Sequence, residues 1–226
     1  MKKLLSVLAV LSVMCGSVFA IGLTIDGNFA VPFTMGSYTT LDSKINDSNY
    51  ITSTTKTVER GIGGDVGVTV LLSKYIGVKA DVGLFFPQSL TANTKTTTVV
   101  GGNATTKETS TTTEYKSDTS STIDFNLFVG PYIAVKSAKK YTISVVPGFS
   151  LISRTTTVKS GDSSNKTNTQ TYGFGAELGA VYKITKNISA NFTCPVIYQF
   201  QTKSGDTTKD IKNLNVTPMA GICWKF

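Results

Sequence analysis

The chain has 226 residues, a formal net charge of +8, three cysteines and no histidine. This length fits a single domain, and so few cysteines exclude a disulfide framework. The positive charge is scattered along the sequence, without a lysine and arginine stripe or a recognisable nucleic-acid-binding motif, so nucleic acid is excluded as the expected partner.

The N-terminus has the pattern of a secretory signal peptide. Lys2 and Lys3 precede an apolar run that is too short to span a bilayer comfortably, and small residues then lead to Ala20. A competing interpretation is lipoprotein processing at Cys15, although the methionine before it fits that signal poorly. Both interpretations predict export, and we expect residues 1–20 to be removed as a signal peptide.

The remaining chain is predicted to form strands. Eight segments alternate between apolar residues and polar or small ones with a period of two, which is typical of a strand with one apolar face. Each holds roughly 10–13 residues, enough for a tilted strand to cross a bilayer. Since no second run of apolar residues is long enough for a transmembrane helix, a membrane location would require a closed barrel. In chain order the segments are 22–33, 62–70, 76–86, 123–134, 141–151, 172–182, 188–200 and 214–226.

The connections between these segments alternate in length. The long, polar ones cover residues 36–57, 87–120, 154–170 and 201–211, and the short turns cover 73–75, 136–140 and 183–187. Eight antiparallel strands with both termini on one side of a membrane give this order, with short periplasmic turns and longer extracellular loops. The short turns carry no acid and six lysines, which are Lys74, Lys136, Lys139, Lys140, Lys183 and Lys186.

The two faces of the segments favour a membrane barrel over a soluble one. A soluble barrel such as a lipocalin would hold apolar residues inside and charges outside. Here one face is almost entirely aliphatic and aromatic, with tyrosines and Trp224 near strand ends, where membrane-interface girdles lie. The other face mixes glycine with charge, which suits a narrow polar interior. The predicted interior charges are Asp26, Asp65, Lys79, Asp81, Asp124, Glu177 and Lys225.

The last segment ends with Trp224 and Phe226 on its apolar face. This ending resembles the C-terminal signal that the barrel-insertion machinery of bacteria reads. With the alternation and the loop order, it makes residues 21–226 similar to the small eight-stranded outer-membrane barrels of the OmpA, OmpX and OmpW type. The resemblance is architectural: it implies an all-β, eight-stranded antiparallel up-and-down transmembrane β-barrel, surrounded by lipid of the bacterial outer membrane, and brings no functional motif.

Enzymatic chemistry is not predicted. Well-known enzymes among outer-membrane barrels depend on a histidine, which this chain lacks. The interior acids are expected to pair with Lys79, Lys225 and Arg60 rather than to form a catalytic pair. Cys194 and Cys223 lie on opposite parities, and the carboxylates are dispersed, so we predict no metal site and no cofactor.

Two functional interpretations remain open. A surface role, which is structural, adhesive or directed at a host factor, is favoured by the threonine-rich residues 96–106, which have two strand-forming arms around a Gly-Gly turn. We expect such strands to extend beyond the membrane as a sheet whose edge can bind a partner strand. Equally open is that these loops are only soluble and antigenically variable.

The alternative function is a narrow channel for small hydrophobic or cationic solutes, with an exit through the wall as in OmpW-like proteins. Side chains fill the interior of an eight-stranded barrel, so an open porin is not expected. Breaks in strand pairing are the possible exits, and the candidate positions are Pro131, Pro147, Pro195 and Pro218. The predicted inward side chains that would occupy the lumen are Phe85, Phe128, Tyr132 and Met219.

Overall fold

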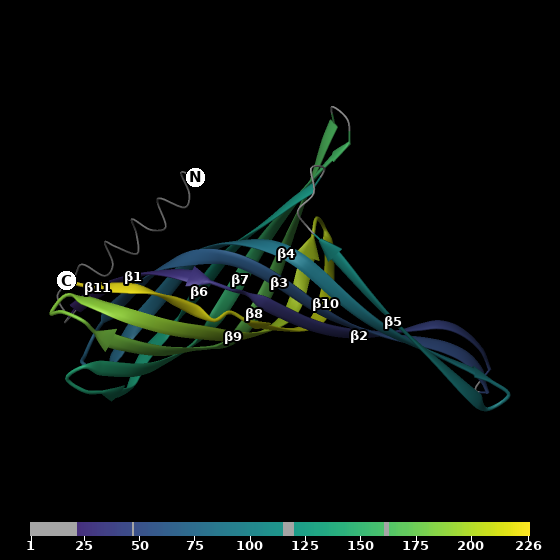
Figure 1. Ribbon diagram of the computed structural model, residues 1–226, viewed down its shortest axis with the longest axis horizontal. Coiled ribbons are helices and arrows are strands. Elements are labelled where there is room, and N and C mark those ends of the chain that lie inside the picture. Colours follow the sequence, from purple (N-terminus) through teal and green to yellow (C-terminus); the bar gives the residue numbers. More distant parts are fainter. Residues whose placement is uncertain (1–21, 47, 115–119, 161–162) are drawn as a thin grey trace.

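The computed structural model describes residues 22–226 except 47, 115–119 and 161–162, so the predicted signal peptide lies outside the described residues. Within this part, no helix is long and apolar enough to cross a membrane. The regular elements are strands (Figure 1). They are β1 (Gly22–Ala30), β2 (Phe33–Asn46), β3 (Asn49–Leu71), β4 (Ile76–Val100), β5 (Asn103–Glu114), β6 (Ser120–Ser137), β7 (Tyr141–Ser160), β8 (Ser163–Lys183), β9 (Ile188–Ser204), β10 (Thr207–Val216) and β11 (Met219–Lys225).

These strands close into an antiparallel ring of eight staves, where a stave is one crossing of the barrel wall. Six staves are single strands, namely β3, β4, β6, β7, β8 and β9, while β1 with β2 and β10 with β11 form the first and last. The ring closes where β1 pairs with β11 and β2 pairs with β10, for example at Ile25 opposite Trp224. The first and last strands meet at this seam, where the Phe226 N–H donates to the Leu23 carbonyl at 2.9 Å. The predicted eight-stranded barrel is confirmed.

Prolines interrupt both staves at the closing seam. The prediction treated residues 22–33 and 214–226 as one strand each and named Pro218 as a candidate break in pairing; β1 ends before Pro32 and β10 ends before Pro218. Proline has no N–H to donate to a ladder. The Val31 N–H still donates to the Pro218 carbonyl at 3.1 Å, and the same register resumes beyond the break, so the wall stays paired there.

The connections predicted as long loops are mostly β-hairpins: the expectation that strands extend into a projecting sheet is confirmed, while the predicted loop bounds were too wide. The pairs β2–β3, β4–β5, β7–β8 and β9–β10 continue their ladders well beyond the predicted segments. Threonine is β-branched and favours strands, so polar composition did not end the pairing. Between β4 and β5 the Gly-Gly turn has positive φ at both residues, Gly101 at 58° and Gly102 at 83°, as a two-residue hairpin turn requires. The two predicted arms around this turn are confirmed.

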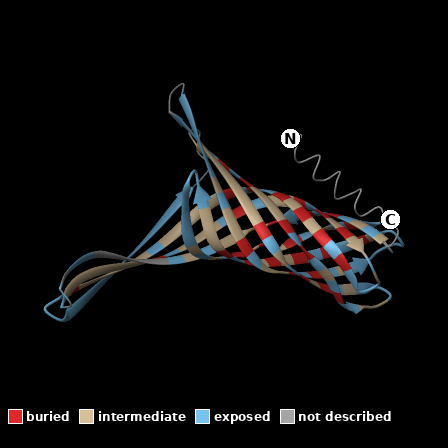
Figure 2. Ribbon diagram, turned by 180° about the vertical axis from the view of Figure 1, so that it is seen from behind, coloured by how far each residue is buried: buried red, intermediate tan, exposed pale blue. Residues whose placement is uncertain are grey.

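The two faces of the ring also have the predicted character. Figure 2 shows most of the buried residues within the barrel, while the projecting hairpins are mostly exposed or half-buried, with Thr55 and Val99 as buried exceptions. Every stave presents exposed apolar side chains on its outer face, for instance Phe29, Val66, Leu84, Val129, Phe149, Leu178, Phe192 and Ile222. Soluble monomers rarely expose so continuous an apolar surface, whereas a barrel in lipid requires one.

Candidate functional site

Lys79 is the centre of a buried charge cluster inside the barrel. Its Nζ lies 2.5 Å from Glu177 Oε1, 3.1 Å from Asp81 Oδ1 and 3.7 Å from Asp26 Oδ2. All four side chains are at most 6% exposed. The three acids come from β4, β8 and β1, so the cluster joins staves across the lumen.

Asn28 extends this cluster to a fourth acid. Its side-chain N–H groups donate to Asp26 Oδ2 at 2.9 Å and to Asp65 Oδ1 at 2.7 Å, while its carbonyl accepts from Asn191 at 2.8 Å. The amide of Asn28 thus links the carboxylates of Asp26 on β1 and Asp65 on β3, which would otherwise face each other as like charges. We call Asp26, Asn28, Asp65, Lys79, Asp81 and Glu177 the inner network.

Glycine creates the space that the inner network occupies. A Cβ on Gly67 would collide with Asp81 Oδ1 and would lie 2.5 Å from Asp26 Oδ1. The same position faces both acids because Gly67 pairs with Asp26 on one side and with Asp81 on the other. The mixture of glycine and charge on one parity therefore reflects packing within a narrow lumen.

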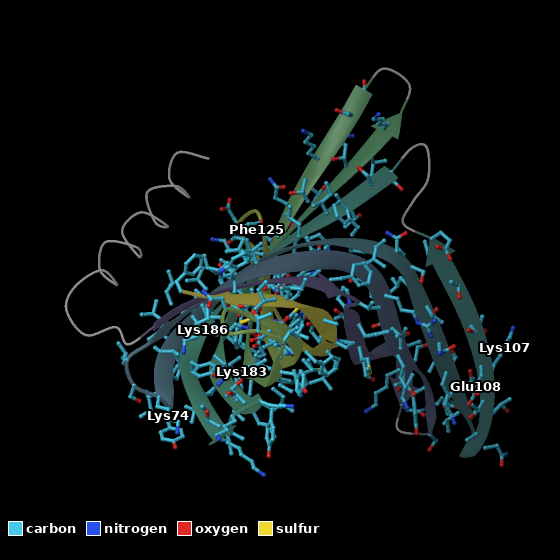
Figure 3. The ribbon with its side chains drawn as sticks, turned by 60° about the vertical axis from the view of Figure 1, so that its left-hand side comes forward. Lys74, Lys107, Glu108, Phe125, Lys183 and Lys186 are labelled. Carbon is cyan, nitrogen blue, oxygen red and sulfur yellow. The ribbon has the colours of Figure 1, made fainter. Side chains whose placement is uncertain are left out.

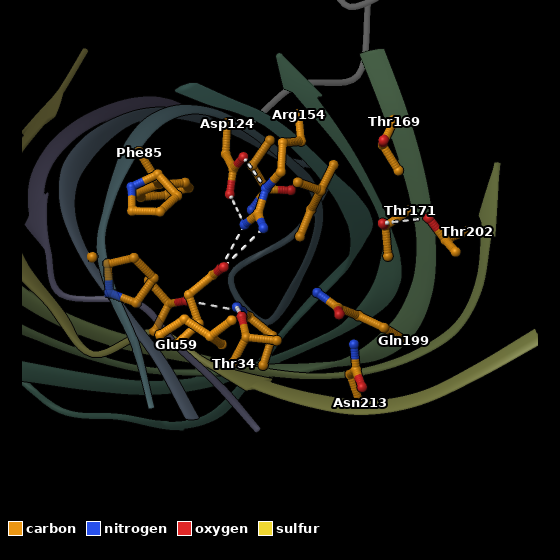
Figure 4. A pocket seen from close by; sticks show the side chains of 18 of the residues that line it. Thr34, Glu59, Phe85, Asp124, Arg154, Thr169, Thr171, Gln199, Thr202 and Asn213 are labelled. Carbon is orange, nitrogen blue, oxygen red and sulfur yellow. Dashed lines mark hydrogen bonds and ion pairs between the residues drawn. The ribbon is translucent and has the colours of Figure 1, made fainter. Parts of the chain in front are cut away.

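A second charge cluster bridges the lumen nearer the long hairpins. The Arg154 guanidinium donates to Asp124 at 2.8 and 2.7 Å and to Glu59 at 2.8 and 2.5 Å (Figure 4). These are paired, fork-shaped contacts, the strong geometry for arginine and carboxylate. We call Glu59, Asp124 and Arg154 the outer bridge.

The predicted interior set is therefore divided. Its remaining members join the inner network, but Asp124 belongs to the outer bridge and Lys225 is exposed at the end of β11, opposite Thr24. Lys225 is a correction: the seam partner of Asp26 is Cys223, and β11 ends before another buried position is reached. Among the predicted partners, Lys79 does pair with the acids, and Arg154 rather than Arg60 holds Asp124.

Sequence reasoning missed Glu59 and Arg154 because both lay at the margins of predicted loops. A signal was present. Glu59 has the same parity as inward Asp65 on β3, and Arg154 has the parity of buried Ser150 on β7. Extending each alternation by a few residues would have placed both side chains inside the lumen.

The outer bridge lies in an open vestibule of about 330 Å³. Its wall combines apolar residues such as Leu90 and Ile152 with uncharged polar ones, among them Thr171, Gln199 and Asn213 (Figure 4). The carboxylates that line it, Asp124 and Glu59, are both held by Arg154, which is a structural pairing. In the part of the chain that the structure describes, no group of three or more acidic or cysteine residues has the arrangement of a metal site.

Apolar side chains separate the vestibule from the inner network. Phe85 packs with Ala30 and Met219 in one cluster, and Phe128, Val146 and Ile197 form another against Tyr132. The neighbouring internal cavity measures about 10 Å³, room for about one water molecule. The inward aromatic residues thus occupy the lumen as predicted.

The projecting hairpins form a second candidate site. The ladder between β2 and β10 ends at Gly36, beyond which β2, β3, β4 and β5 continue together away from the barrel (Figure 1). We call this sheet the wing. It consists of residues 37–46, 49–56, 93–100 and 103–114.

The wing is held together by polar contacts rather than by an apolar core. Hydroxyl pairs link neighbouring strands, as at Thr55 with Thr94 (3.1 Å) and Thr97 with Thr106 (3.4 Å). The two hairpin tips are also joined, since the Gly101 N–H donates to Asn49 Oδ1 at 2.9 Å. All twelve residues of β5 are exposed, and the ladder that β5 forms is with β4. The wing is therefore a sheet with a long open edge.

Comparison with known proteins finds similar solved structures but no relative in sequence. No protein-family model matches the chain, and no curated protein matches it in sequence. It is similar to the crystal structure of Neisserial surface protein A, with 12% identity and a TM-score of 0.47 over 88% of this chain and 97% of that one. It is also similar to the outer membrane protein OprG from Pseudomonas aeruginosa, with 12% identity and a TM-score of 0.47 over 92% of this chain and 96% of that one. For Ail, the attachment invasion locus protein of Yersinia pestis, the identity is 12% and the TM-score is 0.39 over 89% of this chain and 98% of that one. Identities this low extend no function to the present chain.

Proposed function

We propose that the protein is an integral β-barrel of the bacterial outer membrane that keeps its lumen sealed and displays the wing outside the cell. The observation that supports this most directly is the exposed, twelve-residue edge strand β5 on a closed, lipid-compatible ring. In this orientation the short turns and the C-terminus face the periplasm, as in exported barrels. The apolar outer face supplies the membrane contact.

The wing would bind its partner by strand addition at β5. An exposed sheet edge presents unpaired N–H and C=O groups, and natural proteins normally shorten, charge or cover such edges. A partner strand can bond to these groups in a main-chain ladder. The partner proposed is an extended segment of a protein outside the cell, such as a host surface protein.

The turn geometry identifies which β5 groups are available. In a hairpin with a two-residue loop, Val100 and Asn103 exchange hydrogen bonds, and bonded and non-bonded pairs then alternate along the ladder. Residues with odd numbers in β5 therefore bond to β4. Those with even numbers, including Ser110, direct their N–H groups to the open edge.

This assignment gives a matched test. Ser110→Pro removes an edge N–H without removing a β4–β5 bond, whereas Ser110→Ala keeps the N–H and removes only the hydroxyl. We expect Ser110→Pro to weaken adhesion of a non-adherent bacterial host displaying the protein about fivefold, since one lost hydrogen bond is worth ~1 kcal/mol. Adhesion would be measured on cultured epithelial cells and on immobilised matrix proteins.

The controls separate edge binding from other causes. Ser110→Ala should adhere like the wild type. Each variant should also show the difference in SDS-gel mobility between boiled and unboiled samples that is typical of a folded barrel. Equal adhesion by all three proteins would contradict strand addition at β5. A wild type that partitions into water, with no boiling-dependent mobility, would contradict the membrane barrel itself.

The alternative function, a narrow channel, requires a continuous path through the lumen. The packed clusters around Phe85 and Phe128 oppose such a path. We therefore expect the purified protein to give no reproducible conductance steps in planar bilayers, at neutral pH and with either sign of voltage. Steps of constant size, abolished by heat denaturation, would instead support the channel.

A further inference from the structure

The end of the barrel opposite the wing carries lysines and no acidic residue in its short turns. Figure 3 shows Lys74, Lys183 and Lys186 there, far from Lys107 and Glu108 on β5. None of the chain's 14 acidic residues lies in the short turns or after Asp210. We call this end the basic rim, and its exposed lysines are Lys74, Lys136, Lys139, Lys140, Lys183, Lys186 and Lys225.

Two of the turns in this rim have the same construction. In the first, Ser73 Oγ accepts from the N–H groups of Tyr75 and Ile76 at 3.2 and 3.0 Å. In the other, Thr185 Oγ1 accepts from the residues at the same two offsets, at 3.3 and 3.0 Å. Each hydroxyl residue is followed directly by a lysine, so Lys74 and Lys186 extend from equivalent, internally bonded turns.

Exposed apolar and aromatic side chains lie in the same turns as these lysines or directly beside them. Leu72 and Ile184, which precede the two hydroxyl residues, are 50% and 61% exposed. Lys74 Nζ lies 5.2 Å from the Tyr75 ring centre, and Lys136 Nζ lies 5.5 Å from that of Tyr141. Aromatic rings and long lysine stems combined in this way are typical of the level where acyl chains meet headgroups.

We propose that the basic rim binds the phosphates of anionic phospholipids, of the phosphatidylglycerol type, in the periplasmic leaflet. Lysines near a membrane surface attract anionic lipid, and the exposed aliphatic side chains beside them fit acyl chains rather than a soluble polyanion. On the wing, by contrast, Lys95 pairs with Glu108 at 3.4 Å. This inference rests on the proposed membrane placement and is independent of what the wing binds.

The only tryptophan, Trp224, provides a local probe of this lipid. It pairs in register with Ile188, and the next residue, Lys225, donates its N–H to Asn187 at 2.8 Å, so the indole lies beside the turn that carries Lys186. The full chain would be folded into phosphatidylcholine vesicles that contain brominated-acyl phosphatidylglycerol or brominated-acyl phosphatidylcholine. Quenching of Trp224 fluorescence then gives the relative binding of the two lipids.

We expect phosphatidylglycerol to be favoured over phosphatidylcholine about fivefold at low salt, because one lysine near a membrane surface contributes about 1 kcal/mol of attraction to anionic lipid. The preference should be smaller at high salt, which screens this attraction. Replacing Lys183, Lys186 and Lys225 with glutamine should bring the ratio close to equality, whereas arginine at the same positions should keep it. Glutamine at Lys95, Lys107 and Lys203, on the opposite end, should leave it unchanged. Boiling-dependent mobility verifies that each variant is folded.

A wild-type ratio of one, or a ratio that the rim glutamines do not change, overturns the proposal. If the ratio is one and the protein co-sediments with purified cell-wall sacculi in a way that depends on the rim lysines, the partner is an anionic polymer rather than a lipid. Failure of the wild type to enter vesicles at all would count against the proposed membrane barrel, and it is distinguished by the missing mobility shift.

Discussion

Replacing Lys79 with methionine is expected to lower the free energy of unfolding by about 3–5 kcal/mol. The substitution keeps most of the length of the side chain but removes the ammonium that lies among Glu177, Asp81 and Asp26. Those carboxylates would remain buried with like charges as neighbours, which is the costly way to break a buried ion pair. Urea unfolding of the protein in vesicles, followed by the fluorescence of Trp224, measures the change.

An exposed ion pair supplies the control for this prediction. Lys95 and Glu108 are 3.4 Å apart with side chains 58% and 74% exposed, so Lys95→Met should change stability by about 1 kcal/mol or less. Adding Glu177→Gln to the Lys79→Met variant should recover part of the loss, because it removes one uncompensated charge. A Lys79→Met protein as stable as the Lys95→Met protein would show that the inner network contributes little.

Substitution of Gly221 by valine is expected to prevent closure of the barrel or to destabilise it by about 3 kcal/mol or more. A Cβ at this position would collide with the backbone carbonyl of Gly27 across the seam and would lie 2.5 Å from Asn28 Oδ1. Neither a carbonyl within a ladder nor an amide of the inner network can move freely. Folding yield, judged from boiling-dependent mobility, and the urea midpoint measure the effect.

Gly27 offers a matched control from the opposite strand of the same seam. No atom lies within 4 Å of a Cβ placed there, and its parity faces outward. Gly27→Val adds the same side chain at the same end of the barrel, and we expect normal folding. If both valine variants fold with the same midpoint, crowding at the seam does not control closure.

The sequence identified the charged residues of the lumen to different degrees. Alternation assigned Lys79, Asp81 and Glu177 to one interior because parity is a local property of a strand. It assigned Lys225 wrongly, since parity does not tell where the buried part of a strand ends. It also missed Arg154, because a threonine-rich segment was interpreted as loop where cross-strand pairing continues the strand.

By itself, the sequence determined the staves, their order and the two faces of the wall. These follow from a period of two and from the spacing of turns, which depend on neighbouring residues alone. Only the tertiary structure decided which charges meet. Lys79 and Glu177 are 98 residues apart and touch because ring closure brings β4 and β8 to face one lumen. Likewise, the local pattern predicted strand-forming arms around the Gly-Gly turn, but the extent of the wing and the strand at its open edge depend on how far ladders persist between distant strands.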